Sequence, residues 1–406
     1  MENNGSKLSV CGYDCTKCPI YLATISRDLQ TLKQILKKDG EDITVESVGC
    51  LGCFSEKVNH MCDTCFMKNC TKKRGIDSCG KCNNYPCDYT KKYLSSESIA
   101  NLDGIKRIAD NKRCAIIGMS GNSLFYDVDG EKATLVHEEV GGKGYNQAIA
   151  CIRNGIRVSY LTAVGCDKTG EILENFMVEE GIDTYFVKKN KPSLEASIYV
   201  DKEGNNKVVY DQENVATLSR KDVDGFEEEI KRSDCVLLQF EYSKEVIEEA
   251  IKLAKKYNKM IVINPAPMIY PDLDLVKEAD FITPNEEESY KLFGISRNNS
   301  FNNVIEKERK SGLKCILNTV GSKGVIAING DYCEVFSPIN VNPIDTTGAG
   351  DTFNGVFVAT LLRGASVEAS IRRAIIASGL SVTRKYVMDA IPTSVDIEEY
   401  IKRNKL

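Results

Sequence analysis

The chain has 406 residues, of which 42% are hydrophobic and 27% are charged, and its formal net charge at pH 7 is −5. These values are typical of a soluble globular protein with more than one domain. The net charge argues against a large nucleic-acid-binding surface, and the lack of an apolar run of about 18 residues argues against a transmembrane helix. The first residues, MENNGSKLSV, do not have the pattern of a signal peptide, so we expect a cytoplasmic protein without a membrane partner.

Cysteines are concentrated before residue 88, although the whole chain has 17 of them. A pair such as Cys50 and Cys53 can bring two thiolates to one metal ion on a tight turn, and repeated pairs are typical of tetrahedral Zn²⁺ sites. The same spacing suits an iron–sulfur cluster. Disulfides are disfavoured in a reducing compartment, so we expect metal ligands here. The candidates are Cys11, Cys15, Cys18, Cys50, Cys53, Cys62, Cys65, Cys70, Cys79, Cys82 and Cys87.

The cysteine-rich region also contains an amphipathic stretch and one histidine. The apolar residues between Tyr21 and Lys38 recur at helical spacing, which predicts a single helix. His60 is either a further metal ligand or a bystander. His137 is the other histidine of the chain, so a Ser-His-Asp mechanism has little material.

Composition changes near residue 110, which predicts two domains. Residues 1–110 form a cysteine-rich metal-binding domain that ends in a helix or linker, and residues 113–406 form the second domain. In the second domain, predicted strands alternate with predicted helices, which indicates an α/β fold with a mostly parallel sheet. A predicted hairpin at 196–210 could project from it as a lid. The clearest strands are 114–118, 157–164, 235–240 and 260–264, and the clearest helices are 145–153 and 244–257.

The most informative segment is Asp345-Thr-Thr-Gly-Ala-Gly-Asp351, which precedes a strong helical pattern. Gly348, Ala349 and Gly350 allow the backbone to approach a ligand closely, and amides at a helix start face an anion. Such a site suits a transferring phosphoryl group. Asp351 could accept the proton of an attacking hydroxyl. The alternative is a glycine turn followed by an Asp that the helix dipole favours.

Two further segments gain meaning beside this one. Gly141-Gly-Lys-Gly-Tyr-Asn-Gln opens another predicted helix, but it matches neither a P-loop nor a dinucleotide fingerprint. In Thr283-Pro-Asn-Glu-Glu-Glu, Asn285 and Glu288 are one helical turn apart. An amide and a carboxylate suit a hydrated Mg²⁺ and phosphate oxygens. The alternative for this segment is a capped acidic helix start.

The order of these motifs resembles the ribokinase family of carbohydrate kinases. The resemblance also includes Asn264-Pro-Ala-Pro and Thr319-Val-Gly-Ser-Lys-Gly, and it extends from about residue 113 to the C-terminus. It implies a three-layer α/β domain with a small β lid over the sugar. It further implies transfer of the ATP γ-phosphate to a sugar hydroxyl, most simply that of ribose.

The resemblance implies a role for each matching residue. Asp351 would be the catalytic base, and Gly348, Ala349 and Gly350 would form the anion hole. Glu288 would act indirectly on Mg²⁺, and Asp345 and Thr347 would belong to a monovalent-cation site, usually K⁺. The implied ATP-binding residues are Asn285, Thr319, Gly321, Ser322, Gly324 and Gly350, and the implied sugar-binding residues are Gly142, Lys143, Gly144, Asn146, Glu241 and Asp351.

Three segments depart from the family pattern. One is the family's Gly-Ala-Asn before the substrate region, which reads Gln212-Glu-Asn here. The family has Asn-x-Asp after its first strand, where this chain has Gly121 and Ser123. The family's C-terminal cation loop has glycine where this chain has Tyr386. A kinase for a nucleoside or another sugar is therefore an alternative. A metal-dependent sensor whose kinase domain only binds its ligand is a second alternative.

Residues 1–110 resemble a family of uncharacterised prokaryotic cysteine-rich domains. The resemblance depends on Cys-Gly-x-Asp-Cys-x-x-Cys-Pro near the start and Cys-x-x-Cys-x-x-Tyr-Pro-Cys near the end. It implies metal binding, and such a module could contact a protein partner, regulate the kinase or sense redox state. The kinase resemblance also allows a homodimer, because many members of that family dimerise through the lid.

Overall fold

The computed structural model describes residues 19–36, 69–71, 78–79, 88–100, 102, 111–129, 132–200, 206–209, 211 and 213–404. The chain divides into two compact units. One comprises residues 1–110 with 363–369 and 404–406, and the other comprises residues 111–362 with 370–403.

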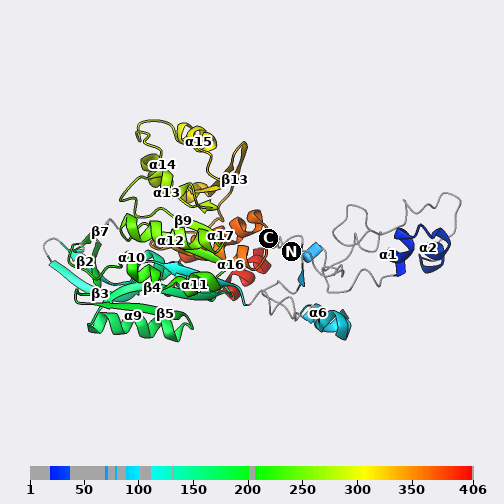
Figure 1. Ribbon diagram of the computed structural model, residues 1–406, viewed down its shortest axis with the longest axis horizontal. Coiled ribbons are helices and arrows are strands. Elements are labelled where there is room, and N and C mark those ends of the chain that lie inside the picture. Colours follow the sequence, from blue (N-terminus) through cyan, green and yellow to red (C-terminus); the bar gives the residue numbers. More distant parts are fainter. Residues whose placement is uncertain are drawn as a thin grey trace. The chain divides into compact units, whose positions relative to one another are not determined.

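The described part of the N-terminal region contains α1 (Pro19–Ile25), α2 (Leu29–Leu36) and α6 (Asp88–Tyr93) (Figure 1). The prediction of one helix over 21–38 was wrong, because the chain turns between α1 and α2. Arg27 has a left-handed φ of 57°, and the Asp28 carboxylate accepts a hydrogen bond of 3.0 Å from the amide of Thr31. Asp28 therefore caps a new helix where the apolar spacing alone suggested continuity.

A nine-stranded sheet forms the centre of the second unit, in the order β13-β12-β11-β10-β9-β8-β1-β4-β5. In this order, each neighbouring pair from β11 through β5 is parallel. Strand β12 is antiparallel both to β11 and to β13. The α/β prediction is confirmed. The strands are β1 (Arg113–Ile117), β4 (Arg157–Gly165), β5 (Asp183–Lys189), β8 (Cys235–Gln239), β9 (Met260–Asn264), β10 (Phe281–Ile282), β11 (Ile316–Thr319), β12 (Val325–Asn329) and β13 (Tyr332–Phe336).

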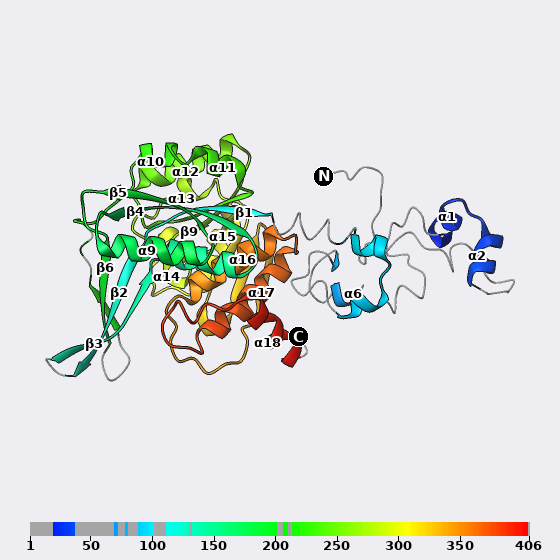
Figure 2. The same ribbon diagram turned by 90° about the horizontal axis from the view of Figure 1, so that it is seen from below.

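Helices cover both faces of this sheet. Figure 2 shows α10, α11 and α12 on one side of the strands and α9 and α16 on the other. This arrangement gives three layers, as expected for parallel strands joined by helices. The helices are α8 (Lys143–Arg153), α9 (Lys168–Glu179), α10 (Arg220–Asp224), α11 (Glu227–Arg232), α12 (Lys244–Lys256), α13 (Leu273–Val276), α14 (Glu286–Leu292), α15 (Phe301–Lys310), α16 (Ala349–Leu362), α17 (Val367–Ser381) and α18 (Ser394–Asn404).

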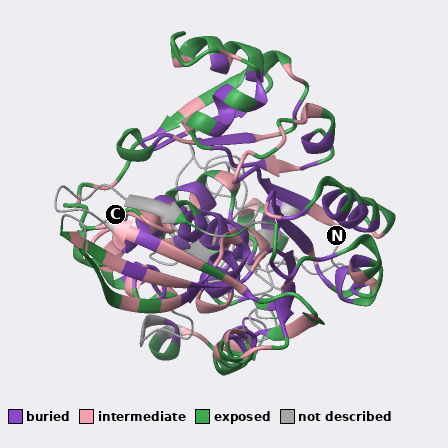
Figure 3. Cartoon of the chain, turned by 90° about the vertical axis from the view of Figure 1, so that its left-hand side faces the viewer, coloured by how far each residue is buried: buried purple, intermediate pink, exposed green. Residues whose placement is uncertain are grey.

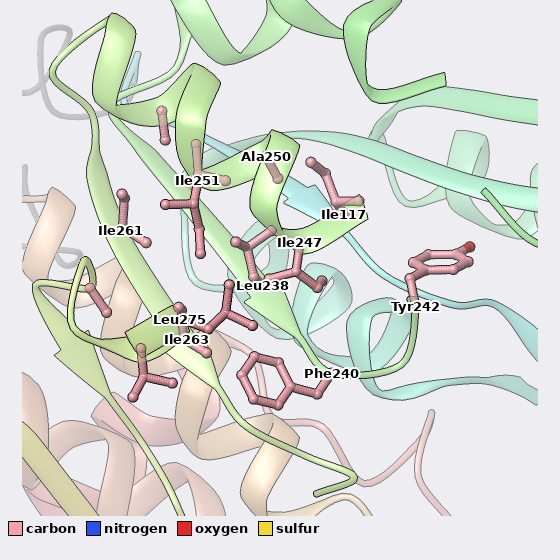
Figure 4. Close-up of a cluster of buried hydrophobic side chains, with 14 of the residues drawn as sticks. Ile117, Leu238, Phe240, Tyr242, Ile247, Ala250, Ile251, Ile261, Ile263 and Leu275 are labelled. Carbon is pink, nitrogen blue, oxygen red and sulfur yellow. The ribbon is translucent and has the colours of Figure 1, made fainter. Parts of the chain in front are cut away.

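The hydrophobic core follows the alternation of side chains along the central strands. Ile117, Leu238 and Ile263 point from β1, β8 and β9 toward Ile247 and Ile251 of α12 (Figure 4). Residues between them in sequence are buried on the opposite face, so both faces of the central strands are covered (Figure 3). Such strands are apolar throughout and fix the position of the loops that follow them.

A separate four-stranded sheet has the order β3-β2-β6-β7. Its strands are β2 (Gly121–Asp129), β3 (Lys132–Gly141), β6 (Leu194–Val200) and β7 (Asn206–Val209), and β2 and β3 extend away from the main sheet (Figure 2). The antiparallel pairing of β6 with β7 confirms the predicted hairpin. We call this sheet the lid. Among the described residues, no helix is long and apolar enough to cross a membrane.

Candidate active site

Asp351 lies in the first turn of α16, and its side chain is buried. Asn146 Nδ2 donates a hydrogen bond of 2.8 Å to its Oδ2, and Gln147 Nε2 donates one of 3.0 Å to its Oδ1. Both donors are on α8, which follows the double-glycine segment. The structure therefore brings the double-glycine motif and the C-terminal glycine motif together at one carboxylate.

Asp351 and its two hydrogen-bond donors come together because α8 packs closely against α16. A Cβ atom at Gly355 would lie 2.4 Å from Cβ of Ala150 and 2.6 Å from the carbonyl oxygen of Gln147. A glycine is needed here because any side chain would separate the two helices. Gly355 thus sets the distance at which Asn146 and Gln147 reach Asp351.

A chain of buried amides connects this carboxylate to the ends of two central strands. Gln147 Nε2 also donates to Asn264 Oδ1 at 3.0 Å, and Asn264 Nδ2 donates to the carbonyl oxygen of Thr283 at 3.0 Å. Thr283 Oγ1 in turn donates to Asn354 Oδ1 at 2.5 Å. Sequence reasoning did not assign roles to Gln147, Asn264 or Thr283. A signal was present, since each polar residue lies inside a recognised motif, Asn264 ends β9 and Thr283 directly follows β10.

Burial and nearby charges set the protonation of the site. Burial raises the pKa of Asp351, while the Lys143 ammonium and the hydrogen bonds from Gln147 and Asn146 oppose this shift. Burial also raises the pKa of Glu288, which Lys143 lowers and the Asp351 carboxylate raises further. Asp351, Glu288 and Lys143 are therefore electrostatic neighbours. A buried carboxylate with a raised pKa beside a cation suits the acceptance of a proton.

The geometry shows a buried carboxylate at a helix start, and the sequence comparisons agree with it. A family model described as pfkB family carbohydrate kinase matches residues 112–394. The chain belongs to the pfkB carbohydrate kinase family. A second model, described as a protein of unknown function, matches residues 7–92.

Similar proteins agree with this family membership. A Haemophilus influenzae ribokinase is 34% identical over 284 residues, covering 68% of this chain and 93% of the relative. A Salmonella typhi deoxyribokinase is 32% identical over 272 residues, covering 65% of this chain and 88% of the relative. The structure of Arabidopsis thaliana ribokinase complexed with ribose and ATP has a TM-score of 0.64 at 23% identity, covering 72% of this chain and 99% of that one, which shows a shared fold. The pfkB kinase is thus a phosphotransferase acting on a sugar.

Glu241 lies shortly after β8, and its carboxylate is at the start of α8. Its carboxylate accepts hydrogen bonds from the backbone amides of Lys143 at 3.0 Å, Gly144 at 3.1 Å and Met119 at 3.0 Å. Burial raises the pKa of Glu241 to about 7, and the amide hydrogen bonds and Lys143 oppose that shift. The structure therefore places this expected sugar ligand against backbone amides, where it caps the helix.

The glycines of the double-glycine segment permit close packing. Gly142 has a φ of 115°, and a Cβ there would lie 2.3 Å from the carbonyl oxygen of Met119. A Cβ at Gly144 would lie 2.6 Å from Cα of Gly118. These two positions therefore bring α8 against the turn after β1, which places Lys143 and Asn146 beside Asp351.

The expected anion hole has one constrained and one open glycine. Gly348 has a φ of 73°, and a Cβ there would lie 2.6 Å from Cγ1 of Val387. A Cβ at Gly350 would meet no atom within 4 Å. The space beside Gly350 is therefore open to a ligand at the start of α16, next to Asp351 and Ala349.

Asn285 and Glu288 form a capping box at the start of α14. Asn285 Oδ1 accepts a hydrogen bond of 2.8 Å from the amide of Glu288, and Glu288 Oε2 accepts one of 2.8 Å from the amide of Asn285. The capped helix start that the sequence offered as an alternative is thus present. It does not oppose a magnesium role, because the Glu288 carboxylate also lies in the electrostatic field of Asp351 and Lys143.

The expected nucleotide residues follow β11 and adjoin this capping box. The amide of Thr319 donates to the carbonyl oxygen of Pro284 at 2.9 Å. Gly321 and Ser322 are exposed in the following turn. Gly324 has a φ of 94°, and a Cβ there would lie 2.0 Å from the carbonyl oxygen of Phe336, so its glycine is required by packing.

Asp345 ties two loops together at the expected monovalent-cation site. Its Oδ1 accepts hydrogen bonds from the amide of Thr347 at 2.9 Å and from its hydroxyl at 2.7 Å. Its Oδ2 accepts one of 3.0 Å from the amide of Tyr386. The carboxylate and hydroxyl oxygens are the donor type that suits a hard cation.

The expected thiol ligands lie mostly outside the described residues. Cys70 is partly buried and Cys79 is buried, and Cys11, Cys15, Cys18, Cys50, Cys53, Cys62, Cys65, Cys82 and Cys87 belong to segments that the structure does not describe. His60 is also outside them. Within the described ranges, no group of three or more His, Cys, Asp or Glu side chains could hold a metal ion.

Proposed function

We propose that the protein is an ATP-dependent kinase that phosphorylates a free pentose, with ribose as the first candidate. The observation that carries this proposal is the buried Asp351 carboxylate, which Asn146 and Gln147 orient at the start of α16. The printed names of the relatives, a ribokinase and a deoxyribokinase, support a pentose as the acceptor.

Asp351 acts as the general base in this proposal. It accepts the proton of the sugar hydroxyl as that oxygen attacks the γ-phosphorus of ATP, and ADP leaves with the electrons of the broken P–O bond. The amides at Gly348, Ala349 and Gly350 stabilise the charge on the transferring phosphoryl group. Burial favours this role, because a dry site strengthens each of these interactions.

The oxygen donors near the base fit metal ions. Glu288 and Asn285 would hold Mg²⁺ through water, and Asp345 and Thr347 would hold a monovalent cation, most simply K⁺. When bound, these ions would neutralise phosphate charge and order the loop before α16. Thr319, Gly321, Ser322 and Gly324 line the adjoining nucleotide site in the proposal.

The sugar pocket favours a second candidate as well. Ser123 lies on β2 where the family pattern has Asp, and a Cβ at Gly141 would lie 3.6 Å from its Oγ and 3.7 Å from Asn146 Oδ1. A serine hydroxyl offers one oxygen to the acceptor, whereas an ionised carboxylate can accept hydrogen bonds from two hydroxyl groups through its two oxygens. This change favours an acceptor with fewer free sugar hydroxyls than ribose, such as a nucleoside. Lys143, Gly142 and Gly144 would position either acceptor.

We also propose that residues 1–110 form a separate cysteine-rich domain that binds Zn²⁺ or an iron–sulfur cluster. The spacing of its cysteines supports this proposal. A regulatory or protein-partner role would fit such a module, since the described hydrogen-bond donors to Asp351, Asn146 and Gln147, belong to the second unit.

A substrate screen tests the acceptor. ADP release is measured with ribose, deoxyribose, fructose, nucleosides and pseudouridine, each at several concentrations. Ribose or deoxyribose is expected to give the highest kcat/KM. Turnover of a nucleoside with no turnover of either pentose would overturn the first candidate and support the second.

A further inference from the structure

A lid strand holds the segment 386–388 through one carboxylate. Glu139 of β3 accepts hydrogen bonds from the amide of Val387 at 3.0 and 3.2 Å and from the amide of Met388 at 3.0 Å. The Glu139 side chain is only 7% exposed. Two backbone amides that are 248 and 249 residues away in sequence thus depend on one side chain of the lid.

Aromatic contacts strengthen the same junction. The His137 ring, two residues before Glu139 on the same strand face, stacks on the Tyr386 ring with centroids 3.6 Å apart and planes at 15°. Phe125 of β2 meets Tyr386 edge-on at 5.1 Å. Tyr386 has a left-handed φ of 67°, which a non-glycine residue adopts only when its surroundings hold it. The lid supplies those surroundings.

The segment 386–388 in turn contacts the start of α16. The Val387 side chain fills the space beside Gly348. A Cβ atom at Gly348 would lie 2.6 Å from Cγ1 of Val387. Asp345 accepts hydrogen bonds from the amide of Tyr386 through one oxygen and from the amide of Thr347 through the other. The backbone that leads into the anion hole therefore rests against a segment that Glu139 holds.

We propose that Glu139 is a positioning residue for phosphoryl transfer, through which the lid sets the geometry of the anion hole. Glu139 fixes Val387 and Met388, Val387 fixes Gly348, and Gly348 begins the turn that presents the amides next to Asp351. This inference rests on the proposed function of that turn. It predicts that damage to the junction acts mainly on kcat, because the anion hole acts most strongly in the transition state.

Three variants and a matched control test the proposal. Glu139→Ala is expected to lower kcat by about 10²-fold, as a misplaced group commonly does, with KM for ATP nearly unchanged. Glu139→Gln keeps a carbonyl acceptor and is expected to recover much of that loss. Glu138→Gln removes the same charge from the neighbouring exposed residue, keeps an oxygen that can accept the hydrogen bond of Asn122 Nδ2, and is expected to behave like the wild type. A wild-type kcat for Glu139→Ala, or an equal loss for Glu138→Gln, would overturn the proposal.

The third variant covers the case in which Glu139→Ala does not fold. Val387→Ala removes the side chain that fills the space beside Gly348 and leaves both amides bound to Glu139, so it is expected to fold but turn over slowly. An unchanged kcat would contradict the proposal.

Amide hydrogen exchange needs no turnover, so it separates this inference from the proposed function. Exchange at Val387 and Met388 is expected to accelerate most in Glu139→Ala, less in Glu139→Gln, and to stay unchanged in Glu138→Gln. Equal exchange rates in all variants would show that Glu139 does not hold the segment. Accelerated exchange without any sugar kinase activity in the wild type would instead refute only the proposed function.

Discussion

Asn146 on α8 donates a hydrogen bond of 2.8 Å to Oδ2 of Asp351 on α16. This bond stabilises the ionised carboxylate, so it lowers a pKa that burial raises. Removing this bond leaves Asp351, the base in our proposal, protonated up to a higher pH than in the wild type.

Asn146→Ala is therefore expected to move the acid limb of the kcat/KM profile to higher pH. The base works only when deprotonated, so activity should fall most at low pH and recover toward high pH. Asn154→Ala is the control, because Asn154 is the C-cap residue of the same helix and donates to the Ala150 and Pro392 carbonyl oxygens away from the site. An acid limb that does not move in Asn146→Ala would contradict the assignment of Asp351 as the titrating base.

Gly348 and Gly350 are expected to respond differently to alanine. Gly348→Ala places a methyl group against Val387 at a φ of 73°, so its melting temperature should fall together with its activity. Gly350→Ala meets no atom within 4 Å and should melt like the wild type. Its methyl group enters the space that we assign to the phosphate, so kcat should fall by up to about 10². A fully active Gly350→Ala protein would place the phosphate elsewhere.

The buried Glu308 of α15 should make the free energy of unfolding depend on pH, and this effect is independent of catalysis. Glu308 is 2% exposed, and burial raises its pKa to about 7. A hydrogen bond of 2.7 Å that Asn318 donates to its carboxylate opposes this rise in pKa. Because the folded state holds this proton more tightly than the unfolded state, stability falls as pH rises from about 4.5 to about 7.

Glu308→Gln removes the ionisation and is expected to raise the free energy of unfolding above pH 7, by at most about 3.5 kcal/mol at about 1.4 kcal/mol per pKa unit. Urea unfolding at pH 5 and pH 8 measures this difference. Glu306→Gln, an exposed change on the same helix, should have no such effect. Equal gains at both pH values would show that the ionisation of Glu308 is not responsible.

The spacing of the cysteines in residues 1–110 predicts that the protein binds a metal. Elemental analysis of the full chain, purified without oxygen, should find zinc or iron. Changing Cys11 and Cys15 together to serine should reduce the metal content while ADP release continues, because the groups that contact Asp351 are amides. A wild-type chain free of both metals would contradict the metal-binding proposal.

The strand and helix pattern of the second unit was predictable because local periodicity determines it. The structure places β9 at Met260–Asn264, as the sequence predicted. Helix α8 begins at Lys143, two residues earlier than expected. Glycines at its start lower the local helix propensity, but the distant Glu241 caps the free amides. A cap supplied from another strand leaves no trace near the helix in the sequence.

The candidate site was predictable as a set of motifs but not as a network. Asp351 was recognisable because glycines and a helical pattern surround it. The bond between Gln147 and Asn264 joins residues 117 positions apart, and the contacts of Glu139 join the lid to a loop 248 residues away. Such contacts depend on how helices and strands pack, which local pattern does not reveal. The turn at Arg27 was missed because apolar spacing continues across it.

ADP release by Asp351→Asn, at saturating sugar and ATP, tests the central assignment most directly. Asparagine keeps the shape of the side chain but cannot accept the proton, so turnover should fall by about 10²- to 10⁴-fold while nucleotide binding persists. A variant that releases ADP as fast as the wild type would show that this carboxylate is not the base.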